Sequence, residues 1–362
     1  MLWFPRMRKA EILTPGQVLA GKYRVDRWLG GGGMSAVYQG FHLGLEQPIA
    51  IKVLLPKLAA SASYVTRFVR EAKAAGKLRG NHVGRVLDVG TDTAPFIVLE
   101  LLEGEDLASL LKARGPFPID EAVDFVIQAC DGLARAHAAN IIHRDVKPGN
   151  LFLTHVDGEP CVKVIDFGVA KQIEEEQTQL TNTSEIFGSP QYMSPEQVRA
   201  SKNVGPRSDV WSLGCVLHEL LTGEAPFVSP SLVSLTTLIL SEPATPLRRR
   251  RPDVPAELEA IVLKCLEKEP QKRHASMIDL AIALAPFGRP NLNGRIVDSL
   301  RRLKIDDVPP SVVPASVPRS VPTAALARVK TGLSAKVIVI TGAATFALLL
   351  AIAFVVDRAL HP

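Results

Sequence analysis

The stretch Ile141-Ile142-His143-Arg144-Asp145-Val146-Lys147-Pro148-Gly149-Asn150 places five polar or charged side chains within eight residues. An apolar segment that reads as a strand, residues 151–153, follows directly, and an amphipathic helix is expected before the stretch over about residues 119–139. Burying so many polar groups beside an apolar strand costs free energy in an ordinary core. We therefore expect a functional loop at residues 143–150.

A second acidic position lies a short distance downstream. Residues 162–165 read as a strand that leads into Asp166-Phe167-Gly168. An acid at a strand end, followed by a glycine turn, is well placed to hold a metal ion through oxygen.

A glycine-rich segment lies near the beginning of the chain, in Leu29-Gly30-Gly31-Gly32-Gly33-Met34-Ser35-Ala36-Val37-Tyr38. A flexible linker has the same composition, but residues 36–41 read as a strand. A dinucleotide site would need a helix there, and a P-loop would need Gly-Lys-Ser/Thr. A strand, a glycine turn and a second strand instead form a flap whose backbone N–H groups can close over phosphates.

A lysine follows at a suitable distance. In Ile49-Ala50-Ile51-Lys52-Val53 the alternation predicts a strand that presents Lys52 on the face opposite Ile51 and Val53. Such a lysine can neutralise phosphate charge if a carboxylate holds its amine in place. Glu71, within a helix expected over residues 63–78, is the candidate. Taken alone, either residue is more ordinary as a solvated surface charge.

In this order and spacing, the segments resemble the eukaryotic-type Ser/Thr protein kinases, most closely their bacterial membrane-anchored members. The resemblance covers roughly residues 23–287 and extends to Ser194-Pro195-Glu196, to residues 209–214 and to Arg273. It implies an α+β, bilobal protein-kinase fold with a small antiparallel β-rich N-lobe and a larger helical C-lobe. It also implies a non-specific Ser/Thr protein kinase that transfers the γ-phosphoryl group of ATP to hydroxyls of protein substrates.

The resemblance assigns roles to individual residues. Asp145 is expected to accept or orient the proton of the substrate hydroxyl, and Lys147 to face the transferred phosphoryl group. Lys52 and Glu71 complete the catalytic set. Asn150 and Asp166 are the expected ligands of Mg²⁺, with Mn²⁺ as a substitute. The ATP-binding residues implied are Leu29, Gly30, Gly31, Gly32, Gly33, Met34, Ser35, Val37, Ala50, Lys52, Glu100, Leu102 and Asp106. The backbone of residues 100–102 is expected to pair with the adenine edge, and Asp106 to meet the ribose.

Other positions match structural and regulatory parts of the family. Glu196 and Arg273 match an ion pair between the activation segment and the helical lobe, and Asp209 matches a residue that supports the catalytic loop. Arg144 beside Asp145 is typical of kinases in which a phosphate on the activation segment docks onto a basic pocket. The segment, residues 166–196, is expected to be autophosphorylated at Thr181 or Thr183, then Thr178, while Ser189 helps to seat the acceptor.

The chain departs from the family pattern at three places, one of which is the unusual turn Asn81-His82-Val83-Gly84 after the helix that carries Glu71. Ser35 occupies the third glycine position of the loop, and Ser194 replaces the usual alanine before Pro195. None of these changes removes a catalytic group. The alternatives to an active protein kinase are a membrane-tethered pseudokinase scaffold that binds nucleotide or partners, and a kinase of small molecules.

Charge and cysteine usage bound the function further. The chain carries a formal net charge of +5, but residues 288–336 contribute +6, so the main body is near neutral and no nucleic-acid partner is expected. The four cysteines form no CxxC pair. We expect free, buried thiols in a reducing compartment. No secretory signal is expected at residues 1–22.

The predicted domain organisation has five parts. A lead-in (1–22) precedes the kinase domain (23–287), followed by a Pro-rich basic juxtamembrane linker (288–336), a transmembrane helix (337–356) and a short extracytoplasmic tail (357–362). Twenty uncharged residues span about 30 Å as a helix. Basic residues upstream place the kinase domain in the cytoplasm, most simply at a bacterial inner membrane. A stripe of Ala343, Ala347 and Ala351 would permit a homodimer.

Overall fold

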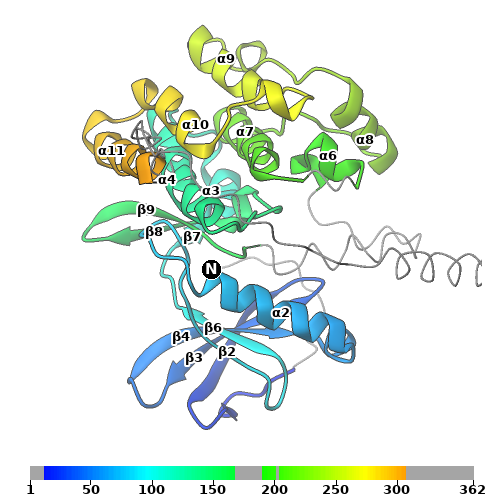
Figure 1. Ribbon diagram of the computed structural model, residues 1–362, viewed down its shortest axis with the longest axis vertical. Helices are drawn as coiled ribbons and strands as arrows, with labels where there is room; N and C mark the ends of the chain where they lie inside the picture. The colour runs from blue at the N-terminus through cyan, green and yellow to red at the C-terminus, as the bar shows by residue number, and fades with distance from the viewer. Residues whose placement is uncertain (1–11, 168–189, 201–203, 307–362) are drawn as a thin grey trace, which may run out of the picture. The chain divides into compact units, whose positions relative to one another are not determined.

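The computed structural model describes residues 12–167, 190–200 and 204–306, all of which belong to the first of two compact units, residues 1–309 and 310–362. Within this unit the described chain forms a sheet-rich lobe followed by a helical lobe (Figure 1). The bilobal fold predicted from the sequence is confirmed.

The N-terminal lobe is an antiparallel sheet with one long helix beside it. Across the sheet the strands run in the order β1 (Val18–Leu19), β2 (Tyr23–Gly31), β3 (Ser35–His42), β4 (Gln47–Leu54), β6 (Phe96–Glu100) and β5 (Val86–Gly90). The helices are α1 (Pro56–Ala59) and α2 (Ala62–Ala75). Phe68 and Ala72 of α2 are buried against Leu54 and Ile97 of the sheet, which holds the helix on this face.

The first strand corrects the predicted beginning of the domain. Leu13 and Leu19 are each 1% exposed and belong to the same apolar cluster as Tyr38 and Ile51. Leu13 and Leu19, which the sequence assigned to a lead-in, are therefore part of the core of the N-terminal lobe.

The C-terminal lobe begins with a three-stranded sheet and is otherwise helical. The strands are β7 (Glu105–Asp106), β8 (Leu151–Val156) and β9 (Glu159–Val164). The α-helices are α3 (Leu107–Arg114), α4 (Ile119–Ala138), α6 (Pro195–Val198), α7 (Pro206–Thr222), α8 (Leu232–Ser241), α9 (Ala256–Cys265), α10 (Met277–Leu284) and α11 (Pro290–Asp306). Short 3₁₀ turns are η1 (Pro148–Asn150), η2 (Pro190–Tyr192), η3 (Leu247–Arg249), η4 (Pro270–Lys272) and η5 (Ala285–Phe287).

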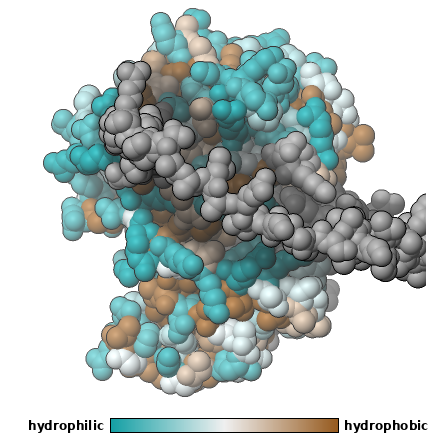
Figure 2. All heavy atoms as spheres, in the orientation of Figure 1, coloured by the Kyte–Doolittle hydropathy of each residue, from teal (hydrophilic) through white to brown (hydrophobic). Residues whose placement is uncertain are grey.

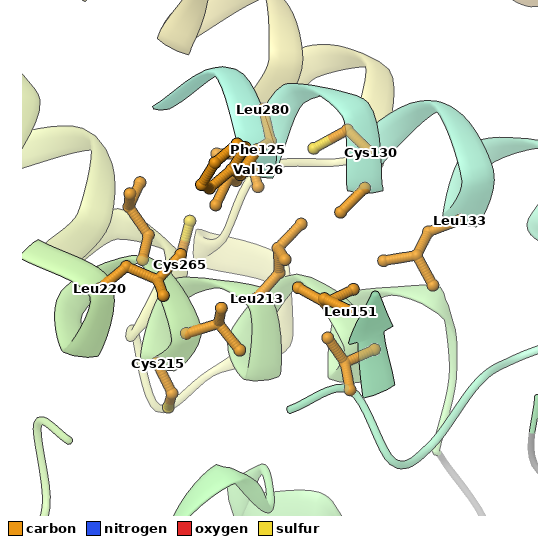
Figure 3. Close-up of a cluster of buried hydrophobic side chains, with 14 of the residues drawn as sticks. Phe125, Val126, Cys130, Leu133, Leu151, Leu213, Cys215, Leu220, Cys265 and Leu280 are labelled. Atoms are coloured by element: carbon orange, nitrogen blue, oxygen red, sulfur yellow. The ribbon is translucent and has the colours of Figure 1, made fainter. Parts of the chain in front are cut away.

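The core of this lobe lies where α4 meets α7. Figure 3 shows Phe125, Cys130 and Leu133 of α4 facing Leu213 of α7 and Leu151 of β8. All four cysteines of the chain are buried and free, as predicted. Burial raises the pKa values of the Cys130 and Cys215 thiols well above their usual range. On the face shown in Figure 2, hydrophilic and hydrophobic residues are interspersed over both lobes.

Helix α11 differs from the prediction of an extended linker beginning at residue 288. Val297 and Leu300 are buried against the C-terminal lobe, and Leu292, Ile296 and Leu303 lie along the same side at helical spacing. The only proline of this helix is Pro290 at its first position, where a proline is tolerated. The other prolines of the predicted linker begin at residue 309. The composition of residues 288–336, taken as one segment, therefore did not indicate the helix at its beginning.

The predicted transmembrane helix, residues 337–356, lies outside the described residues. Among the residues that are described, no helix combines the length and apolar character needed to cross a membrane.

Candidate active site

The glycine-rich segment forms the hairpin between β2 and β3. Strand β2 ends at Gly31 and β3 begins at Ser35, and the amide of Gly32 donates to the carbonyl of Ser35 at 2.9 Å. A Cβ on Gly31 would lie 3.1 Å from that carbonyl oxygen, so position 31 has little room for a larger residue. The strand, turn and strand expected from the sequence are confirmed.

Lys52 reaches from this sheet toward the C-terminal lobe. It lies on β4 opposite Val37 of β3 and is 7% exposed. Its Nζ lies 2.7 Å from Oδ1 of Asp166, which follows β9 in the second lobe. The predicted lysine and the predicted metal ligand therefore meet between the two lobes.

Glu71 takes a different position from the one expected. No hydrogen bond or ion pair joins it to Lys52 among the described residues, and its Oε2 is buried without a hydrogen-bond partner there. Burial raises the pKa of Glu71 to about 7, against the opposing effect of Arg70, Arg144 and Arg67. In this conformation the Lys52 amine is held by Asp166, and the proposed pairing of Lys52 with Glu71 stays a prediction.

The catalytic loop brings three of the predicted side chains together. Lys147 Nζ lies 2.8 Å from Oδ2 of Asp145. Asn150 donates from Nδ2 to Oδ2 of Asp145 at 3.0 Å and to the carbonyl of Asp145 at 2.7 Å. Pro148 begins the 3₁₀ turn η1, which folds Asn150 back toward Asp145. The spacing of these residues therefore lets Lys147 and Asn150 both contact the carboxylate of Asp145.

The same loop is anchored from beneath by Asp209 of α7, as predicted. Asp209 is fully buried and accepts the amide hydrogens of His143 at 2.9 Å and Arg144 at 2.8 Å. His137 of α4 lies 2.7 Å away through Nε2. Burial would raise the pKa of Asp209, but the hydrogen bond with His137 and the nearby charges lower it. These bonds hold Arg144 at a positive φ of 63°.

His137 is a residue that sequence reasoning missed. It lies at the end of α4, where its spacing from the loop matches no motif, and its partner is 72 residues away in the chain.

Asp166 and Asn150 fit the requirements of a magnesium site that also takes oxygens from phosphate. Because Nδ2 of Asn150 donates to Asp145, its amide oxygen is the atom left to act as a ligand. The Asp166 side chain is 42% exposed toward the cleft. Partial burial would raise its pKa, but Lys52 outweighs that effect and the pKa is lowered, which favours the ionised form. Mg²⁺ is commonly held by one or two protein oxygens together with substrate phosphates and waters.

The remaining ATP-binding residues lie on the N-terminal sheet or just beyond it. Leu29, Gly30 and Gly31 belong to β2, Ser35 and Val37 to β3, and Ala50 and Lys52 to β4, while Gly32, Gly33 and Met34 form the turn between the first two strands and Leu102 follows β6. Glu100 ends β6. Asp106 ends β7 and caps the N-terminus of α3, where its carboxylate accepts hydrogen bonds from the amide and the hydroxyl of Ser109. A contact between Asp106 and a ribose remains a prediction.

The end of the activation segment is fixed to the C-terminal lobe. Glu196 and Arg273 form the predicted pair, with two bonds of 2.8 and 2.9 Å, and Ser208 donates to the same carboxylate at 2.6 Å. Burial would raise the pKa of Glu196, but its bonds with Arg273 and Ser208 lower it. The candidate phosphorylation sites Thr178, Thr181 and Thr183, together with Ser189, lie outside the described residues.

The family model described as "Protein kinase domain" matches residues 23–281. The chain belongs to the protein kinase family. Helix α11 lies beyond the part that the family model matches.

Curated relatives are bacterial kinases. The chain is 38% identical over 273 residues to "Serine/threonine-protein kinase PknB" of Mycolicibacterium smegmatis, an alignment that covers 74% of this chain and 43% of the relative. It is 40% identical over 268 residues to "Serine/threonine-protein kinase pkn3" of Myxococcus xanthus, covering 72% and 49%. The chain thus spans less than half the length of these relatives.

A solved structure gives the same fold. The Mycobacterium tuberculosis PknI kinase domain matches with a TM-score of 0.60 and 29% identity, covering 76% of this chain and all of that domain. The fold and the order of the motifs are therefore those of bacterial Ser/Thr kinases.

Proposed function

We propose that this protein is an active Ser/Thr protein kinase that transfers the γ-phosphoryl group of ATP to hydroxyls of protein substrates. One observation carries the proposal: Lys147 and Asn150 both lie within hydrogen-bond distance of the Asp145 carboxylate. The relatives' names and the family model support the same activity.

The arrangement divides the chemistry among four residues. The Asp145 carboxylate orients the substrate hydroxyl and takes its proton, while Asn150 holds that carboxylate in place. Lys147, 2.8 Å from Asp145, supplies positive charge where the transferred group becomes negative. Lys52 contributes a second positive charge from the opposite lobe. Magnesium, held by Asn150 and Asp166 when bound, would neutralise the phosphate oxygens.

Phosphate transfer from labelled ATP tests this function. The full-length chain is incubated with Mg²⁺ and a generic basic protein, beside Asp145→Asn and a control, Asp157→Asn, which changes an exposed aspartate in the turn between β8 and β9. Incorporation by the wild type and the control that is lost in Asp145→Asn supports the kinase. No incorporation by folded wild type with either Mg²⁺ or Mn²⁺ would instead favour the pseudokinase scaffold.

The proposal extends to the activation segment. Thr181→Ala, alone and combined with Thr183→Ala, removes the acceptor hydroxyls and leaves the catalytic residue Asp145 unchanged. These variants should lose most of the autophosphorylation. Phosphopeptide mapping of active wild-type protein checks this, and the absence of phosphate between residues 168 and 188 would contradict it.

We also propose that residues 337–356 anchor the protein in the bacterial inner membrane, with the kinase domain in the cytoplasm and a homodimer formed through the alanine stripe. The support is the length and composition of the segment and the basic residues that precede it. The full chain should resist alkaline extraction from membranes, whereas a chain that ends at Lys336 should be released. Equal release of both would refute the anchor. Unchanged crosslinking of Ala347→Leu would remove the support for the dimer.

A further inference from the structure

An ion pair between a buried lysine and a partly buried glutamate joins the two lobes. Lys163 of β9 in the C-terminal lobe contacts both carboxylate oxygens of Glu100 through Nζ, at 2.9 and 3.1 Å. Glu100 ends β6 in the N-terminal lobe and begins the backbone predicted to pair with adenine. The same Oε1 accepts the amide hydrogen of Arg85 at 2.7 Å. One carboxylate therefore ties three segments together.

The burial of these groups makes the pair costly to break. Lys163 is only 8% exposed, and lysines are almost never buried without a partner. The Glu100 side chain keeps 24% of its exposure. Losing the Lys163 amine would leave a carboxylate held by one amide hydrogen and close enough to water to turn outward.

The backbone around Lys163 defines where the pair acts. The amide of Val164 donates to the carbonyl of His82 at 3.0 Å, and the amide of Gly84 donates to the carbonyl of Val164 at 2.9 Å. These two bonds lie on the same strand as Lys163, three residues before Asp166. The Lys163–Glu100 pair adds a contact between the same strand and the end of β6.

We propose that Lys163 is a positioning residue for the nucleotide. By holding Glu100, it sets the distance between the backbone of residues 100–102, which faces the adenine end, and Asp166, which faces the phosphate end. Strand β9 and the residues just after it would thus position both ends of the nucleotide. The inference rests on the proposed nucleotide-binding function, but it assigns Lys163 a role that the kinase motifs do not contain.

The test separates positioning from general stability. Lys163→Met keeps the length of the side chain and removes its charge, while Lys163→Arg keeps the charge. The control Arg289→Met breaks the ion pair between Arg289 and the buried Asp124 on the α4 side of the lobe. For each full-length variant, the Kd of a fluorescent ATP analogue, the KM for ATP, kcat and the unfolding temperature are measured.

We expect Lys163→Met to raise Kd and KM roughly tenfold, which corresponds to about 1.4 kcal/mol. kcat should change less than about twofold, which is the signature of lost ground-state and transition-state binding together. Lys163→Arg should restore most of the affinity, and Arg289→Met should leave it unchanged. In a double-mutant cycle, Glu100→Gln should make the Lys163→Met change nearly neutral for Kd.

Two results would overturn the proposal. One is a lower unfolding temperature in Lys163→Met with Kd and KM unchanged, which would show a purely structural ion pair. The other is additive effects of Lys163→Met and Glu100→Gln on Kd. Because Kd is measured without turnover, a wild-type chain that binds ATP but transfers no phosphate would refute the proposed activity while leaving this test intact.

Discussion

Replacing Glu71 with glutamine should stabilise the protein near neutral pH and weaken its activity. Burial raises the pKa of this carboxyl from 4.5 to about 7. Between those two values the folded protein retains a proton that the unfolded chain has released. The free energy of unfolding therefore falls as the pH rises from about 4.5 to about 7, and it stays lower above about pH 7.

The size of the effect follows from the two pKa values. Their difference corresponds to about 3 kcal/mol for a carboxyl fully shielded from water. Because Glu71 is only partly buried, screening reduces the expected effect to roughly 1–2 kcal/mol. Glutamine has nearly the same shape and no charge, so it avoids this penalty at pH 8 and gains little at pH 5, where the carboxyl is largely protonated.

Urea unfolding of the wild type and Glu71→Gln at pH 5 and pH 8 measures this. The variant should gain roughly 1–2 kcal/mol at pH 8 and almost nothing at pH 5. The proposed kinase activity should also fall, because the predicted pair with the Lys52 ammonium requires a carboxylate at position 71. Glu159→Gln, which removes an exposed carboxylate from β9, is the control. The same difference in stability at both pH values would refute the reasoning.

Three further substitutions test the packing of the C-terminal lobe by urea unfolding. Arg273→Met should cost about 3–5 kcal/mol because the Glu196 carboxylate stays buried without its partner; an equal loss in the double variant with Glu196→Gln would contradict this. Gly132→Ala should cost about 1–3 kcal/mol, since the new Cβ would lie 2.2 Å from the His82 carbonyl oxygen; unchanged stability would argue against that close approach. Leu300→Ala should cost about 2–5 kcal/mol because Leu300 is fully buried, and a loss below about 1 kcal/mol would mean that α11 does not hold to the lobe.

Much of the candidate site could be read from the sequence because its residues are close together in the chain. Asp145, Lys147 and Asn150 lie within six positions of the chain. Their spacing in the sequence was therefore enough to predict that their side chains lie close together. The strand that carries Lys52 was equally clear, because alternation reports directly which face a side chain occupies.

The parts that escaped prediction depend on distant contacts. Lys163 and Glu100 are 63 residues apart, and each sits in a strand whose pattern explains it without the other. The position of Glu71 is a conformational property of α2 relative to the sheet, which a residue pattern does not encode. Helix α11 was missed for another reason: its apolar positions were averaged with the proline-rich residues that follow.

The attachment of α11 has a mechanical consequence. The helix is 17 residues long, about 25 Å, and Arg289 and Asn293 at its beginning bind the buried Asp124. A force applied beyond residue 306 therefore reaches the end of the helix farthest from this polar anchor. The helix would detach one turn at a time from its C-terminal end, so the contacts of Leu303 and Leu300 would break first. Traction on the C-terminal side of the chain would thus be absorbed by α11 before it strained α4, which carries the support of the catalytic loop.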